Sequence, residues 1–203
     1  MNVDAPRLCL ATPPLAGAGS FAPLLTQALS AGDIASLLIR FAVEPLRERE
    51  AILRALAPIA QEKGVAVLAE NDLNAALRAG VDGVQIDDDD AALAAAVRKL
   101  SPRYIVGAGN CATRDDAMRA GEAGADYVLL DPERPADLIA RVEWWAALFN
   151  TPCVARAETL EMVAPLARAG ADFILLDTAV WDDPRGPATS VATALTDLKG
   201  AWT

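Results

Sequence analysis

The chain has 203 residues, of which 53% are hydrophobic, and a formal net charge of −10 at pH 7. This acidity argues against nucleic acid or an anionic membrane as a partner. The sequence contains no histidine, which excludes histidine-based nucleophile systems, histidine general bases and His-rich zinc or iron sites. Chemistry must therefore use carboxylates, arginine, lysine, backbone amides or a bound hard cation.

Two further features bear on the cellular location. No apolar run reaches the ~18 residues that a membrane span needs, and the N-terminus lacks the basic region, apolar core and cleavage site of a signal peptide. The three cysteines, Cys9, Cys111 and Cys153, are scattered and odd in number, as in a protein with reduced thiols. We expect a cytoplasmic protein that binds a small-molecule ligand.

Short apolar runs alternate with amphipathic runs along the whole chain. We expect strands near residues 7–12, 34–41, 65–69, 83–87, 104–108, 127–131, 153–156 and 173–177. We expect helices near residues 21–31, 45–63, 72–79, 89–100, 114–123, 136–149, 159–169 and 187–198. Strict alternation also permits an open doubly wound sheet. The number of strands favours a closed barrel, and no break in composition divides the chain, so we predict an α/β protein with a single (β/α)8 TIM barrel domain over residues 1–203.

One phrase recurs three times in the chain. The copies read Arg-Ala-Gly-Val-Asp-Gly-Val-Gln-Ile-Asp at 78–87, Glu-Ala-Gly-Ala-Asp-Tyr-Val-Leu-Leu-Asp at 122–131 and Arg-Ala-Gly-Ala-Asp-Phe-Ile-Leu-Leu-Asp at 168–177. Each copy predicts a helix that ends at glycine and a buried strand that follows at once. The copies lie about 45 residues apart, which is near the length of two strand–helix units of an eightfold barrel.

Charged residues gather where the expected strands end, which is the active face of such a barrel. Clustered carboxylates there suit Mg²⁺ and can equally bind a cationic ligand, although each aspartate can instead cap the helix that follows it. Because every second strand contributes to the same interior layer, we expect at least two of Asp87, Asp131 and Asp177 to face a common pocket.

The strand-end motifs carry a resemblance to a known family. Asn71-Asp72, the segment Gly-Val-Asp-Gly-Val-Gln-Ile-Asp-Asp-Asp-Asp at 80–90, and Gly-Ala-Asp-Tyr-Val-Leu-Leu-Asp-Pro at 124–132 resemble segments of the thiamine phosphate synthase / TenI family of small barrels. That family's segments read Asn-Asp-Arg, Gly-Ala-Asp-Gly-Val-His-Leu-Gly-Gln-x-Asp and Gly-Ala-Asp-Tyr-Val-x-x-Gly-Pro. The match in chain order and spacing extends over most of the chain.

The resemblance implies an enzyme of thiamine biosynthesis. In the family, a Mg²⁺ at the top of the barrel and several cationic and glycine-rich segments hold the pyrophosphate of a hydroxymethylpyrimidine, which a thiazole phosphate then displaces. By position, Asp72 and Asp90 resemble the metal ligands, and Asn71 and Arg40 resemble the pyrophosphate contacts. The resemblance assigns no catalytic residue in this chain.

The chain also departs from the family at phosphate-handling positions. The lysine after the second strand is absent, Gly109 stands in place of a serine, and residues 133–137 read Glu-Arg-Pro-Ala-Asp in place of Thr-x-Thr-Lys. Ala157-Glu158 replaces a Gly-Gly pair, and Asp177 replaces a serine. Carboxylates at these places oppose the positive field that a phosphate requires.

Two functional interpretations follow from these departures, beside a third in which the acidic face is merely solvated and the partner is another protein. The first is a transferase of this family, impaired or altered in its substrate. The second is a non-catalytic binding or regulatory protein on the same barrel, whose acidic pocket, with Asp131 and Asp177, takes a cation or an amine. Fold alone does not decide between them.

Trp144 and Trp145 are neighbours on the helix expected over 136–149. Adjacent helix positions face about 100° apart, so packing onto the barrel accounts for one of the two at most. The other is a candidate contact in a homodimer.

Overall fold

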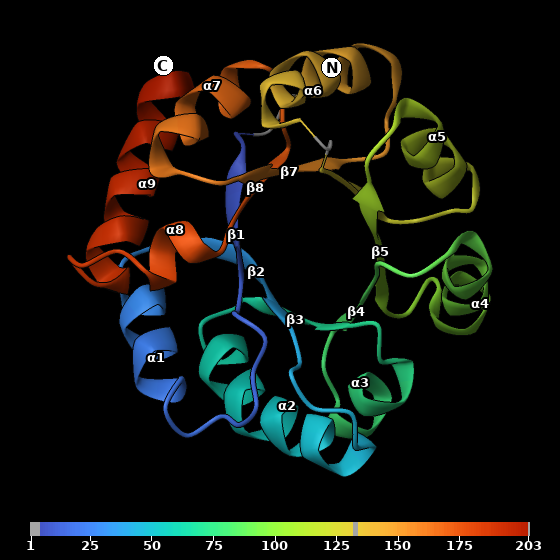
Figure 1. Ribbon diagram of the computed structural model, residues 1–203, viewed down its shortest axis with the longest axis vertical. Helices are drawn as coiled ribbons and strands as arrows, with labels where there is room; N and C mark the ends of the chain where they lie inside the picture. Colours follow the sequence, from blue (N-terminus) through green and yellow to red (C-terminus); the bar gives the residue numbers. More distant parts are fainter. Residues whose placement is uncertain (1–4, 132–133, 203) are drawn as a thin grey trace.

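A computed structural model describes residues 5–131 and 134–202. In it, parallel strands β1 to β8 close into a barrel in chain order, with β1 paired to β8. The helices form a ring outside the strands (Figure 1). The predicted (β/α)8 TIM barrel is confirmed. Pro132 and Glu133, which belong to the segments compared above with the family, lie outside the described residues.

The strands are β1 (Arg7–Ala11), β2 (Ile34–Ile39), β3 (Ala66–Glu70), β4 (Gly83–Ile86), β5 (Ile105–Cys111), β6 (Tyr127–Leu130), β7 (Cys153–Ala157) and β8 (Phe173–Leu176). The α-helices are α1 (Ala22–Ser30), α2 (Leu46–Gln61), α3 (Leu73–Ala79), α4 (Asp90–Leu100), α5 (Arg114–Glu122), α6 (Leu138–Leu148), α7 (Val163–Arg168), α8 (Thr178–Trp181) and α9 (Pro187–Trp202). Short 3-10 turns precede α6 and α7. None of the described helices is long and apolar enough to cross a membrane.

The short helix α8 is the element that the sequence does not predict. Asp177 begins it by accepting a hydrogen bond from the Thr178 amide at 2.7 Å. Trp181, at its end, donates from Nε1 to the Ala11 carbonyl at 2.6 Å and packs edge-on against Phe21. A four-residue helix has no periodicity to detect, and these contacts to distant residues hold it in place.

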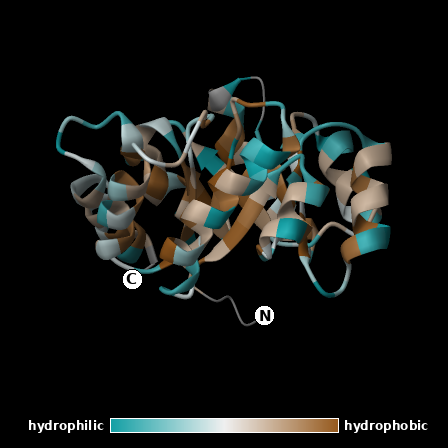
Figure 2. Cartoon of the chain, turned by 90° about the horizontal axis from the view of Figure 1, so that it is seen from below, coloured by the Kyte–Doolittle hydropathy of each residue, from teal (hydrophilic) through white to brown (hydrophobic). Residues whose placement is uncertain are grey.

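Side chains of each strand alternate between two apolar layers, as the period of a strand requires. Outward residues such as Leu130 pack between the strands and the helices, and inward residues such as Leu129 and Leu175 form a separate cluster inside the barrel. Figure 2 shows hydrophobic strands in the middle of the molecule and hydrophilic residues toward its outside. Asp131 follows Leu129 by two positions, and Asp177 follows Leu175 by two positions, so both aspartates lie on the side of their strands that faces the barrel axis.

The three repeated phrases end their helices in the same way. Gly80, Gly124 and Gly170 have φ angles of +72°, +88° and +97°, in the left-handed region that glycine adopts without the steric cost of a Cβ. This turn reverses the chain into the strand that follows.

The aspartate two residues after each glycine has a structural role. Its Oδ2 accepts a hydrogen bond from a backbone amide of the preceding strand: Asp82 from Val67 at 2.7 Å, Asp126 from Val106 at 2.8 Å and Asp172 from Cys153 at 2.8 Å. Each carboxylate thus ties the entry of an even-numbered strand to the odd-numbered strand before it. The sequence repeat therefore reflects a repeated clamp at the N-terminal face of the barrel.

The tryptophan pair divides as expected. Trp145 is 1% exposed and donates from Nε1 to the Thr151 carbonyl at 2.7 Å. Trp144 is half-buried, and the Arg114 guanidinium carbon lies 4.7 Å from the centre of its ring. Packing accounts for Trp145, and a homodimer contact through Trp144 stays a prediction.

We expect Asp126→Ala to lower the free energy of unfolding by about 1–3 kcal/mol, because the partly buried Val106 amide loses its acceptor. Asp126→Asn keeps an acceptor oxygen and should cost less. Urea unfolding followed by circular dichroism measures both variants. Equal losses in the two would show that the charge, and not the hydrogen bond, is what stabilises the clamp.

Candidate functional site

A network of arginines and carboxylates lies at the C-terminal ends of the strands. Arg156 of β7 contacts Oδ2 of Asp131 through Nε at 3.2 Å and Oδ2 of Asp177 through Nη1 at 3.4 Å. Nη2 of Arg40, directly after β2, lies 3.5 Å from the same Oδ2 of Asp177. The structure thus brings Arg40, Asp131 and Asp177 together, as expected from their strand-end positions, and adds Arg156 as the link between them.

Asp177 divides its two oxygens between two tasks. Oδ1 caps α8 through the Thr178 amide, and Oδ2 holds both arginines. The residue is only 7% exposed, and charge pairs with little access to water interact strongly. Arg40 is fixed on its other side by Thr12, because its Nε donates to the Thr12 carbonyl. Asp177 therefore caps a helix and pairs with both arginines at once, and a common pocket for Asp131 and Asp177 stays a prediction.

Asp87 is held from three neighbouring strands. Its amide donates to Oδ1 of Asn71 at 2.7 Å, and its carbonyl accepts from Nδ2 of Asn110 at 2.8 Å. Its Oδ1 accepts from Nε2 of Gln85 at 2.8 Å. Asn71 and Asn110 have φ angles of +51° and +52°, a region uncommon for residues other than glycine and typical of sites where surrounding contacts hold a strained backbone. Asn71, a candidate substrate contact, thus uses its side-chain oxygen within the protein.

A hydrogen-bonded column continues from Asp87 toward the barrel interior. The Tyr127 hydroxyl donates to Oε1 of Gln85 at 3.0 Å, and Gln85 donates to Asp87. Burial raises the pKa of Tyr127 well above its usual value, so the phenol stays protonated at neutral pH. The sequence did not predict a role for Gln85 or Tyr127, because each lies within an expected strand and no local motif distinguishes it from a residue of the core.

Glu70, at the end of β3, completes this group. Burial and then the charge of Asp87 raise the pKa of Glu70 to about 7, against the opposing effect of Arg40 and Arg156. Burial also raises the pKa of Asp87. Two adjacent carboxylates do not both ionise readily, which is consistent with the raised pKa of each. Sequence reasoning missed Glu70, whose only signal is its place at a strand end.

The two residues that resemble metal ligands lie in separate ion pairs. Asp72 caps α3 by accepting from the Ala75 amide at 2.8 Å, and its Oδ2 lies 3.3 Å from Nη1 of Arg49. Oδ2 of Asp90 accepts from Nε of Arg119 at 2.8 Å. Within residues 5–131 and 134–202, no three acidic or cysteine side chains group closely enough to enclose a metal ion.

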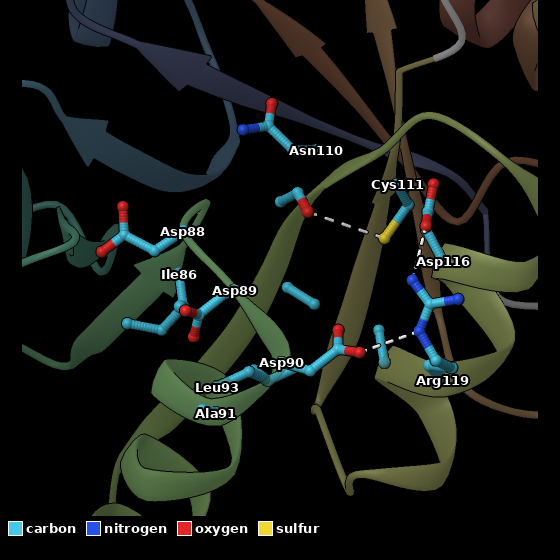
Figure 3. Close-up of a pocket in the computed structure, with 13 residues that line it drawn as sticks. Ile86, Asp88, Asp89, Asp90, Ala91, Leu93, Asn110, Cys111, Asp116 and Arg119 are labelled. Carbon is cyan, nitrogen blue, oxygen red and sulfur yellow. Dashed lines mark hydrogen bonds and ion pairs between the residues drawn. The ribbon is translucent and has the colours of Figure 1, made fainter.

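A cavity of about 510 Å³ opens between the chain segments that lead from β4 into α4 and from β5 into α5. Figure 3 shows Asp88, Asp89 and Asp90 on one side and Arg119 reaching across from α5 toward Asp90. Asp89 caps α4 by accepting from the Ala92 amide at 2.8 Å, so the expected cap of this helix is confirmed for Asp89. The volume is within the range of small-molecule pockets.

Gly109 on β5 explains why Asp87 fits. A Cβ at position 109 would overlap the Asp87 carboxylate and approach the Gln85 amide. The resembled family has a serine at the position of Gly109 and a small residue at the position of Asp87. The two departures therefore compensate sterically, because the carboxylate lies in the space that a side chain at 109 would take.

Comparisons with known proteins agree with this geometry. A family model described as thiamine monophosphate synthase matches residues 8–180. A thiamine-phosphate synthase of Rhodospirillum centenum is 39% identical over 92% of this chain and 94% of the relative, and one of Hyphomonas neptunium is 36% identical over 91% and 90%. The solved structure of a thiamine phosphate pyrophosphorylase from Pyrococcus furiosus has a TM-score of 0.84 at 20% identity, covers 97% of each chain and shows the likeness of the fold. The non-catalytic interpretation is not favoured by these relatives.

We expect Gly109→Ser to lower the free energy of unfolding by about 1–3 kcal/mol, because the new side chain collides with the Asp87 carboxylate. Adding Asp87→Gly should recover at least ~1 kcal/mol relative to the sum of the two single changes. Urea unfolding of the four proteins in this cycle measures the coupling. Gly17→Ser is the control, since nothing lies near a Cβ at position 17, and additive effects at 87 and 109 would contradict the steric exchange.

Glu70 predicts a pH dependence of stability. Its folded pKa of about 7 exceeds its usual value of 4.5, so the folded protein binds more protons between these values and its stability falls as the pH rises through them. Glu70→Gln should raise the urea midpoint at pH 8 and flatten the decline between about pH 5 and 7. Exposed Glu143→Gln is the control. If the stability of Glu70→Gln depended on pH as that of the wild type does, Glu70 would not be the source of the pH dependence.

Proposed function

The chain belongs to the thiamine monophosphate synthase family, and on this premise we propose that it couples a hydroxymethylpyrimidine pyrophosphate to a thiazole phosphate, forming thiamine phosphate. The observation that carries the proposal is the presence of Arg40, Asn71 and Asp72 at the C-terminal face of the barrel. These are the positions at which the family resemblance requires pyrophosphate and metal contacts.

The reaction forms a C–N bond to the thiazole as the C–O bond to pyrophosphate breaks. Negative charge grows on the leaving pyrophosphate, so fixed positive charge at that place lowers the barrier. Arg40 is suited to this task, because Thr12 holds its guanidinium and its backbone amide in place. A bidentate guanidinium matches phosphate oxygens better than a lysine would.

Asp72 and Asp90 would hold Mg²⁺. Each carboxylate oxygen accepts no more than one of the hydrogen bonds described here, so lone pairs remain for a hard cation. Mg²⁺ often takes only one or two protein carboxylates and completes its shell with water and substrate phosphates, so either carboxylate alone suits such an ion, although the two lie in separate ion pairs with Arg49 and Arg119. When bound, the ion would supply positive charge to the leaving pyrophosphate.

The site differs from an open phosphate site because carboxylates already neutralise its arginines. Asp177 holds both Arg40 and Arg156, and Asp131 holds Arg156 as well. An incoming phosphate must compete with these internal carboxylates for the same guanidinium groups. We therefore expect weak binding of the thiazole phosphate and at least ~10³-fold slower formation of thiamine phosphate than in an ordinary family member.

Asp177→Ser should raise kcat/KM for the thiazole phosphate about tenfold, chiefly by lowering KM, because it frees Arg40 for phosphate and leaves Arg156 paired with Asp131 alone. Serine can still cap α8, so the loop should persist. Steady-state formation of thiamine phosphate from the two substrates with Mg²⁺ measures the change. Exposed Asp115→Ser, on α5, alters the net charge equally and should leave KM unchanged. No formation by either the wild type or Asp177→Ser, at any substrate concentration, would refute the proposed reaction.

A further inference from the structure

A second cavity, of about 370 Å³, lies at the opposite end of the barrel. Its walls come from inward residues near the beginnings of the strands, among them Cys9 of β1, Ala66 of β3 and Phe173 of β8. Leu38 and Leu68, nearer the strand ends, belong to the interior apolar cluster that underlies the charged network. We call this space the basal cavity.

The basal cavity exists because small side chains stand where barrels usually place large ones. Barrel interiors are normally filled by layers of bulky branched residues. In β2 and β3, Ala35, Ser36 and Ala66 line the space instead. On the far wall, the Tyr127 ring lies in the place where a side chain on Gly107 would project. Small residues on one side and a displaced ring on the other leave room for a ligand.

The walls are mostly apolar, and their charged residues, Arg7 and Asp126, are exposed at the rim. Burial raises the pKa of the Cys9 thiol to about 11, so this thiol is neutral at pH 7 and behaves as a small apolar group. Arg7 at the rim is paired with Asp33 through two hydrogen bonds of 3.1 and 3.2 Å. Asp126 accepts the hydrogen bond from the Val106 amide described above. An anionic ligand therefore finds no free cationic partner among the described residues that line this cavity.

Gln85 and Tyr127 line the basal cavity with hydrogen-bonding capacity to spare, and Ser36 adds a hydroxyl to its wall. Gln85 uses one N–H of its amide on Asp87 and its oxygen on Tyr127, which leaves a second N–H. The Tyr127 oxygen donates its only proton and keeps lone pairs. The surroundings thus offer a few hydrogen-bonding groups within a mostly apolar space.

We propose that the basal cavity binds a small uncharged aromatic molecule of one or two fused rings, with Gln85 and Tyr127 supplying its hydrogen bond. An apolar cavity of about 150 Å³ is enough to admit benzene, and this one is more than twice as large. The rings of Tyr127 and Phe173 favour an aromatic guest over an aliphatic one. The inference is independent of the reaction at the other end of the barrel.

Indole is the probe, and its binding to the full chain is measured by calorimetry and by thermal shift. We expect saturable binding to one site, and no binding of indole-3-carboxylate, whose charge the walls exclude. Ala66→Leu should weaken indole binding at least ~10-fold by filling the cavity. Ala147→Leu adds the same atoms at an exposed position on α6 and should leave binding unchanged.

Tyr127→Phe gives an independent measurement that does not depend on filling the cavity. It removes one hydrogen-bonding oxygen and should weaken indole binding about fivefold. If Ala66→Leu fails to fold, Ala66→Val replaces it with a smaller expected loss. Absence of saturable indole binding to the wild type, or equal binding by the Ala66 and Ala147 variants, would overturn the proposal.

Discussion

Closing eight parallel strands on one another leaves each strand with a row of side chains that can point only toward the barrel axis. Along β6 and β8 this row runs from an aromatic ring through a leucine to an aspartate, as Tyr127, Leu129 and Asp131 show for β6. The inward row of each strand therefore contributes to both ends of the barrel and to the apolar layer between them. A change of one residue in register would exchange this row with the one that faces the helices, so the site depends on the alternation being kept in every strand.

The charged end of the interior combines arginines with carboxylates. The Asp87 carboxylate lies where a side chain on Gly109 would project, and Asp177 pairs with Arg40 and Arg156. Both carboxylates place negative charge in a region where the proposed substrates carry phosphate. Both arginines pair with internal carboxylates, although Nε of Arg156 is buried without a hydrogen-bond partner among the described residues. Family membership and an acidic pocket are thus compatible in one structure.

The column of Tyr127, Gln85 and Asp87 runs between the two ends of the interior. Buried polar groups are costly unless each finds a partner, and here every member has one. The column also explains two glycines of β5, since Gly107 makes room for the tyrosine ring and Gly109 for the carboxylate. Packing and hydrogen bonding therefore impose the same choice of residues on this strand.

The sequence by itself determined the barrel, because strand and helix periodicity, the glycine stops and the threefold repeat are local signals that one chain segment carries. It also located the charged face, since strand ends of a parallel barrel share one side. Only the tertiary structure decided which charges meet: Arg156 bridges Asp131 and Asp177, and Glu70 lies beside Asp87. These pairings join residues far apart in the chain, and they depend on ångström-scale distances and on burial, which no local pattern encodes.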